Sequence, residues 1–89
     1  MNLNKGDFIN SKYSKFPSLI IQKSENFYLI CIEEFGGDYL QILQKEATLI
    51  NLNPSQELSI LSKFEKWFYS SHSDIYQEII IKNLNNYYL

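Results

Sequence analysis

The sequence predicts an α+β fold, in which a small five-stranded antiparallel barrel of the SH3-like or Tudor-like kind precedes a C-terminal pair of helices. Up to residue 53, short apolar runs alternate with turn residues, which is typical of short strands. From Pro54 onward, apolar residues recur at spacings of three and four, which is typical of amphipathic helices. The 89 residues have room for one hydrophobic core. We therefore expect a single domain, with a β portion at 1–53 and a helical hairpin at 54–89 packed on it.

Turn residues place the expected strands. Gly36 and Gly37 give the strongest turn signal, because glycine adopts positive φ without a Cβ clash. The segment from Phe27 to Ile32 is apolar at every position, whereas a strand with one wet face would alternate apolar and polar residues. One face of this strand is thus expected to point into a barrel and the other to lie under the helices. The expected strands are residues 6–11, 18–23, 27–35, 39–44 and 48–52.

The first expected helix begins at Pro54. Asn53 can cap it, and Gln56 at the third position completes an arrangement like a capping box. The helix is expected to run to about Tyr69. Its apolar positions are Leu58, Leu61, Phe64, Trp67 and Phe68.

A second expected helix follows a serine-rich break. The break spans residues 70–73, and Ser73 can cap a segment that starts at Asp74. The β-branched run at 78–82 leaves an edge strand as the alternative. The apolar positions of this segment are Ile75, Tyr76, Ile79, Ile80, Leu84, Tyr87 and Tyr88.

Composition narrows the function classes. The net charge is −2, the eight lysines are scattered and arginine does not occur, so a phosphate-binding stripe is absent from the sequence. A barrel that binds RNA or single-stranded DNA remains the alternative function, because aromatic side chains can stack on bases. The aromatic residues for such stacking are Phe8, Tyr13, Phe16, Phe27, Tyr28, Phe35 and Tyr39.

Cysteine usage and hydropathy favour a cytoplasmic protein without membrane association. A single cysteine, Cys31, excludes an internal disulfide, and the N-terminal residues lack the apolar core of a signal peptide. The longest apolar run, 27–32, is far shorter than the ~20 residues that span a bilayer. The preference for Ile, Leu, Asn, Ser, Tyr and Lys, with no Arg or Val, indicates an AT-rich genome, such as that of a low-GC bacterium, a plastid, a phage or a mobile element.

The residues with catalytic potential do not form a recognisable site. Residues 71–74 contain the Ser, His and Asp of a hydrolase triad, but neighbours in one loop do not converge as a triad must. His72 and Cys31 are the only residues of their types, and zinc needs three or four ligands. We expect no catalytic residue, no metal and no cofactor.

Four acidic residues are a second candidate group: Glu33, Glu34, Asp38 and Glu46. Adjacent strand residues point to opposite faces, so Glu33 and Glu34 cannot pair as acid and base without a bulge. These carboxylates are expected to be solvated charge or an acidic face for a basic partner.

The opening of the sequence resembles that of SH3-like barrels, including the PemK and MazF ribonuclease toxins. The residues that carry this resemblance are 5–9 and 16–21. The arginine of those toxins has no counterpart, so no catalytic residue is carried over. The plan of a Tudor-like barrel followed by two helices is similar to that of PipX, the cyanobacterial PII-interacting coactivator.

Large amphipathic side chains are abundant near the C-terminus. They either complete the core or form a docking surface, since Tyr and Trp dominate interface hot spots. We expect a non-enzymatic protein-binding regulator or inhibitor, monomeric or homodimeric, of which an inhibitor carried by a phage or mobile element is one version. The expected partner-binding residues are Trp67, Phe68, Tyr69, Tyr76, Tyr87, Tyr88 and Leu89.

Overall fold

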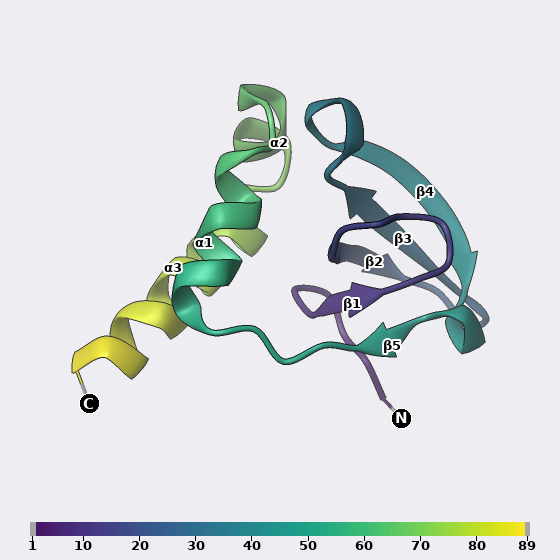
Figure 1. Ribbon diagram of the computed structural model, residues 1–89, viewed down its shortest axis with the longest axis horizontal. Helices are drawn as coiled ribbons and strands as arrows, with labels where there is room; N and C mark the ends of the chain where they lie inside the picture. The colour runs from purple at the N-terminus through teal and green to yellow at the C-terminus, as the bar shows by residue number, and fades with distance from the viewer. Residues whose placement is uncertain (1, 89) are drawn as a thin grey trace.

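The protein has two layers, an antiparallel sheet and a group of helices packed on one of its faces (Figure 1). The computed structural model describes residues 2–88, without the side chains of residues 35 and 84–88. The α+β class predicted from the sequence is confirmed. The strands are β1 (Phe8–Asn10), β2 (Ser18–Lys23), β3 (Phe27–Ile32), β4 (Asp38–Leu43) and β5 (Thr48–Leu49), and short 3₁₀ helices η1 (Glu34–Gly36) and η2 (Gln44–Glu46) flank β4.

The five strands form one antiparallel sheet in the order β4-β3-β2-β1-β5. All five expected strands exist, but the first, third and fifth are shorter than expected. Gly6 lies in a turn, η1 replaces the end of the third strand, and the chain leaves the sheet after Leu49. Within the described residues, β4 and β5 are opposite edges of the sheet, so a closed barrel is not confirmed.

The apolar run of β3 contributes to a core on each face of the sheet, as the sequence predicts, although Phe27 at its start is exposed. Cys31 belongs to a core with the helices that includes Leu19 and Phe68. Tyr28 and Ile30 point to the opposite face, where they pack in a second core with Ile9, Ile20, Ile42 and Leu3. Since successive strand residues alternate between faces, one continuous apolar strand serves both cores.

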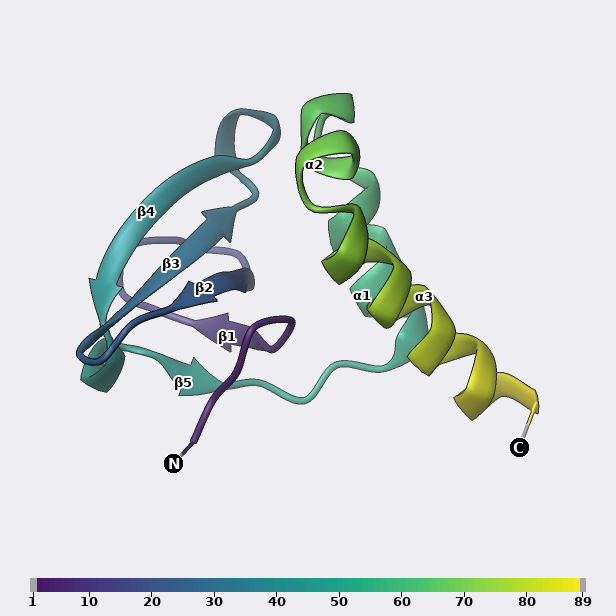
Figure 2. The ribbon, with the colours of Figure 1, turned by 180° about the vertical axis from the view of Figure 1, so that it is seen from behind.

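The helical layer consists of α1 (Pro54–Ser62), α2 (Lys66–Ser71) and α3 (Ser73–Tyr88). The predicted cap of α1 is confirmed: Gln56 N–H donates to Asn53 Oδ1 (2.8 Å), and Asn53 N–H donates to Gln56 Oε1 (3.0 Å). α3 is helical across residues 78–82, so the edge-strand alternative is wrong. Figure 2 shows α3 extending away from the sheet toward the C-terminus. No helix in the described part of the chain is long and apolar enough to cross a membrane.

The single helix expected from Pro54 to Tyr69 is interrupted between α1 and α2. The N–H of Glu65 donates to the carbonyl of Gly36 on the β3–β4 connection (2.8 Å), so it leaves the helical hydrogen-bond ladder. The break lets Phe64 enter the core at 4% exposure. The buried face of α1 also differs from the expected one, because Leu58 is 39% exposed whereas Ile60 is buried.

Gly37 is expected to tolerate a side chain less well than Gly6. Its φ is +104°, and an added Cβ would lie 3.2 Å from Phe64 and 3.3 Å from Cys31 Sγ. Gly6 has a similar φ of +95° but no atom within 4 Å of an added Cβ. Positive φ costs a non-glycine residue about 1–2 kcal/mol, and overpacking at Gly37 adds about 1 kcal/mol or more.

Urea unfolding should therefore rank Gly37→Ala as less stable than Gly6→Ala, with both less stable than the wild type. Gly6→Ala is the matched control, because it adds the backbone strain without the crowding. Equal losses of unfolding free energy in the two variants would show that crowding of the added Cβ against Phe64 does not affect stability.

Candidate functional site

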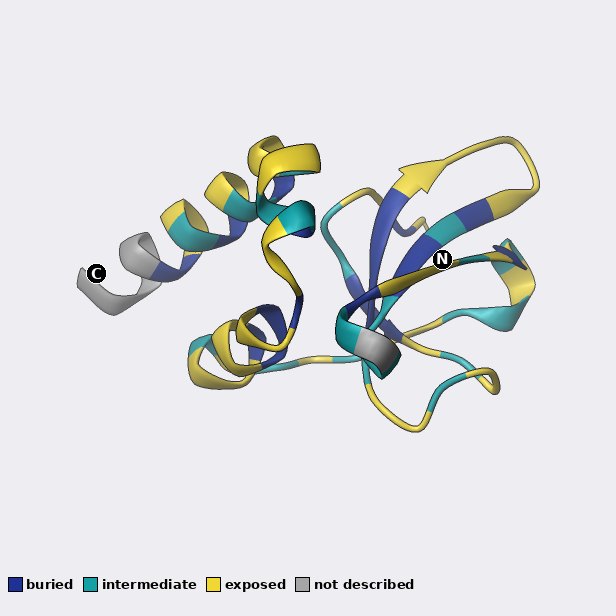
Figure 3. Ribbon diagram, turned by 90° about the horizontal axis from the view of Figure 1, so that it is seen from above, coloured by how far each residue is buried: buried dark blue, intermediate teal, exposed yellow. Residues whose placement is uncertain are grey.

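The helices cover only one end of the sheet face that they pack against. Along β3 on this face, exposure rises from Cys31 (0%) through half-buried Leu29 to Phe27 (36%). Figure 3 shows the exposed β2–β3 connection at the side of the sheet away from the helices. We call the uncovered part the open face. It consists of Gln22, Phe27, Leu29, Gln41 and Leu43.

Strand register brings the side chains of the open face together. Phe27 pairs with Leu43 and Leu29 pairs with Gln41 across β3 and β4, while Gln22 pairs with Leu29 from β2. Paired residues of antiparallel strands project to the same face, so these side chains are neighbours. A register shift between Ile20 and Gln22 allows Gln22 to face the same side as Leu29.

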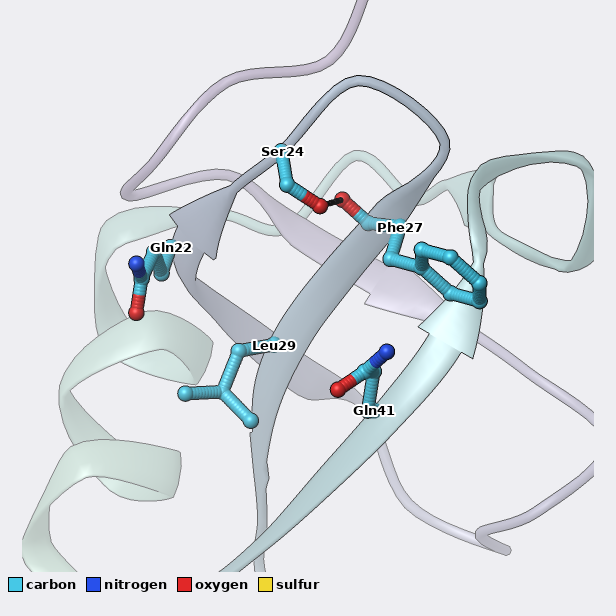
Figure 4. Close-up of a pocket in the computed structure, with 5 residues that line it drawn as sticks. All are labelled: Gln22, Ser24, Phe27, Leu29 and Gln41. Atoms are coloured by element: carbon cyan, nitrogen blue, oxygen red, sulfur yellow. Dashed lines mark hydrogen bonds between the residues drawn. The ribbon is translucent and has the colours of Figure 1, made fainter.

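Two adjoining hollows lie on the open face, and Phe27 lines both. The first has a volume of ≈ 220 Å³ and is lined by Gln22, Ser24, Phe27, Leu29 and Gln41. Figure 4 shows Gln22 and Gln41 on either side of Leu29, with Ser24 donating a hydrogen bond to the Phe27 carbonyl (3.3 Å). The second, of ≈ 460 Å³, is lined by Glu25, Asn26, Phe27, Leu43, Gln44 and Lys45. Apolar floors with amide groups at the rim suit amphipathic side chains of a partner.

An aromatic seam joins the open face to the helices. Tyr39 lies on the same side of β4 as Gln41 and is 40% exposed. Its ring packs edge-on against Trp67 (centroids 5.1 Å apart) and His72 (5.6 Å), and its hydroxyl hydrogen-bonds with His72 Nε2. The seam continues through Phe68, Tyr69 and Tyr76, whose rings contact one another in sequence.

The predicted partner-binding residues fall into three groups. Phe68 is fully buried, so it is a core residue and reaches no partner while the core is intact. Trp67, Tyr69 and Tyr76 are half-buried against the same core, and the Tyr69 hydroxyl donates to the Leu61 carbonyl. The side chains of Tyr87 and Tyr88, and Leu89 as a whole, lie outside the described residues.

Sequence reasoning did not single out the open face as a binding surface. Its only signal was the alternation in β4, where Leu40 and Ile42 point to one core and Tyr39, Gln41 and Leu43 to the other side. That period assigns residues to a face, but it does not say how far the helices extend over it.

The free edge of β4 carries its own protection. The Gln44 N–H donates to the Asn26 carbonyl (3.0 Å), so in the alternating antiparallel pattern the N–H groups of Tyr39, Gln41 and Leu43 point away from β3. The Tyr39 N–H donates to Asp38 Oδ1 (2.8 Å), and the Leu43 N–H donates to Glu46 Oε1 (2.9 Å). Carboxylates thus occupy both ends of the edge and discourage pairing with another strand.

The residues with catalytic potential have separate partners. Asp74 forms an ion pair with Lys5 (2.8 Å), whereas His72 forms a hydrogen bond with Tyr39. The Asp and His of this loop therefore contact other residues and not each other. Burial raises the pKa of the Cys31 thiol to about 12, which keeps it protonated and unreactive at neutral pH.

The four acidic residues do not form a shared site either. Glu33 pairs with Lys63 (2.9 Å), Glu34 accepts from Ser14 (2.8 Å), and Asp38 and Glu46 cap backbone N–H groups of β4. Among the described residues, no three His, Cys, Asp or Glu side chains are grouped to hold a metal ion.

The structure defines this protein as an α+β domain with an open five-stranded antiparallel sheet, a helical layer on one face and an uncovered apolar end. Comparison with protein-family models, with curated proteins and with solved structures finds no match for this chain.

Glu46 is expected to contribute to the acid sensitivity of the fold. Hydrogen bonds from the Tyr13 hydroxyl and then from the Leu43 N–H, together with Lys12, lower the pKa of the Glu46 carboxyl below its ordinary value. A carboxyl with a lowered folded-state pKa stabilises the fold above its ordinary pKa of ~4.3, and this contribution is lost as pH falls through the lowered value.

Glu46→Gln should therefore lose less unfolding free energy than the wild type between neutral pH and about pH 3. The measurement is urea unfolding across that pH range. Glu25→Gln removes the same charge from the exposed β2–β3 turn and controls for net charge. Parallel pH profiles of Glu46→Gln and the wild type would contradict the assignment.

Proposed function

We propose that this protein is a small, non-enzymatic, cytoplasmic regulator or inhibitor that binds a protein partner through the open face and the adjoining Tyr39–Trp67 end of the seam. The observation that carries the proposal is the exposure of three large apolar side chains, Phe27 (36%), Leu43 (36%) and Tyr39 (40%), on the sheet face whose other end is buried under the helices. Exposed apolar patches rimmed by polar groups mark interaction sites.

The chemistry of this surface favours a protein over a small polar substrate. Burying a Phe or Leu side chain contributes about 1.5–3 kcal/mol, and the hollows beside Phe27 can each accept a partner side chain. The amides of Gln22 and Gln41 can orient the partner by hydrogen bonds. Trp67 and Tyr39 add the residue types that are enriched in interface hot spots.

We further propose that the curved sheet is an open form of an SH3-like or Tudor-like barrel. The support is topological: β1 to β4 form a sequential antiparallel meander, and β5 returns to pair with β1. The second core, around Tyr28 and Ile30, would then be the barrel interior.

Substitutions on the open face should reduce partner recovery. Phe27→Ser and Leu43→Ser change side chains that are already 36% exposed, so the fold is expected to persist while hot-spot contacts are lost. Co-purification from the native host should fall about tenfold for each, the equivalent of ~1.4 kcal/mol.

The matched control is Ile81→Ser, which removes an even more exposed apolar side chain (56%) from α3. It should retain the partner at the wild-type level. If both open-face variants recover the partner at the wild-type level, the open face is not the binding surface. If partner recovery is lost instead when residues 87–89 are removed, the C-terminal aromatic residues bind the partner.

A nucleic-acid-binding function is the second candidate, on the evidence of one loop. Between β1 and β2, Tyr13 (45%) and Phe16 (44%) are exposed beside Lys12 and Lys15. Aromatics interleaved with lysines suit the stacking and phosphate contacts of single strands. Two of the lysines near these rings are paired with carboxylates, however. Lys12 pairs with Glu46, and Lys63, which lies over the Phe16 ring, pairs with Glu33.

A salt titration with a single-stranded oligonucleotide separates the two functions. We expect no measurable binding at low salt, because the local carboxylates offset the phosphate attraction. Binding that falls steeply with salt and is lost in Tyr13→Ala and Phe16→Ala, but not in Phe27→Ser, would favour nucleic acid instead.

A further inference from the structure

A cavity separate from the open face lies where the β1–β5 side of the sheet meets the helices. Its volume is ≈ 280 Å³, and none of its lining residues belongs to the open face. Strand β1, the segment from β5 to α1, and the helices α1 and α3 all contribute to its walls. The lining residues are Asp7, Phe8, Leu49, Ile50, Asn51, Leu52, Glu57 and Lys82.

Glu57 is the unusual residue of this cavity. It is 5% exposed, and its Oε1 accepts from Lys82 Nζ (3.1 Å), while its Oε2 is buried and has no hydrogen-bond partner among the residues that the structure describes. A buried carboxylate oxygen without a donor is costly, because it has lost its hydration without replacement. A donor brought into the cavity would recover part of that cost.

The rest of the lining specifies the kind of donor. Asp7 and Glu57 supply two carboxylates against the single ammonium of Lys82, so the cavity has a surplus of negative charge. Phe8, Ile50 and Leu52 provide apolar walls that suit an alkyl stem. The complementary ligand is an organic cation with several N–H donors.

A guanidinium group fits these requirements better than an ammonium group. It is planar, weakly hydrated and carries five N–H donors, so it can bond two acceptors at once in a desolvated site. Lys82 already supplies an ammonium, and Oε2 still has no partner within the described part of the chain. Because the sequence contains no arginine, the chain has no guanidinium of its own for this cavity.

We propose that the cavity between β1, α1 and α3 binds a guanidinium group, with Glu57 as the principal acceptor and Asp7 as the second. The group comes either from an arginine side chain of a protein or from a free guanidino compound. This site does not depend on the function proposed for the open face.

The test is a titration of the full-length, isotope-labelled chain followed by amide chemical shifts. The probes are methylguanidinium chloride and an acetyl-Ala-Arg-Ala-amide peptide, each at millimolar concentration. The controls are the same peptide with citrulline, which is the neutral isostere of arginine, and tetramethylammonium chloride at equal ionic strength. Saturable shifts at Asn51, Leu52, Glu57 and Lys82 are expected with the guanidinium probes alone.

Two variants make the assignment specific. Glu57→Gln should weaken binding at least fivefold, because it removes the acceptor charge. Lys82→Met should strengthen binding at least threefold, because it keeps the aliphatic stem and removes the competing ammonium. Glu78→Gln, on the exposed side of α3, changes net charge equally and should bind as the wild type does.

Shifts of equal size with citrulline or tetramethylammonium, or unchanged affinity in Lys82→Met, would overturn the proposal even if Glu57→Gln fails to fold. Binding of methylguanidinium as tight as that of the peptide identifies a small guanidino compound, and binding of the peptide alone identifies an arginine of a protein. Phe27→Ser should bind the probes normally, so failure of this site and failure of the open face are distinguishable.

Discussion

The central constraint on this fold is a strand that is apolar on both faces. β3 presents Tyr28 and Ile30 to one side and Leu29 and Cys31 to the other, so neither side can remain in water without a large free-energy cost. Curvature of the sheet covers the first side, and the helices cover the second. The helical cover ends between Cys31 and Phe27, and the open face begins there.

The position of the open face depends on where the helical layer is anchored. The Glu65 N–H bonds the Gly36 carbonyl, Phe64 packs beside Gly37, and Lys63 pairs with Glu33, so the junction of α1 and α2 is fixed to the β3–β4 connection. This junction covers the end of the sheet nearest η1. The opposite end, at the β2–β3 connection, therefore has no helix over it (Figure 3).

Local signals predicted the elements well, whereas tertiary contacts decided their details. Asn53 and Gln56 cap α1 as expected, because capping depends on residues within one turn. The break before Lys66 could not be predicted, since it depends on a carbonyl that lies 29 positions away along the chain, at Gly36. The helical period also assigned Leu58 to the core, whereas this side chain is exposed. The exposure of Phe27 and the burial of Phe68 were not predicted for a common reason. Periodicity shows which residues share a face, but it does not show which part of that face another element covers.

The guarded edge of β4 limits what the open face can bind. An apolar face beside a free strand edge would ordinarily invite another strand and lead to aggregation. Here Asp38 and Glu46 accept the outward N–H groups at both ends of β4, so an incoming strand would have to displace two carboxylates. The hollows around Phe27 carry no such protection. Side chains of a partner can therefore enter where a partner strand is discouraged, and this favours a discrete complex over open-ended association.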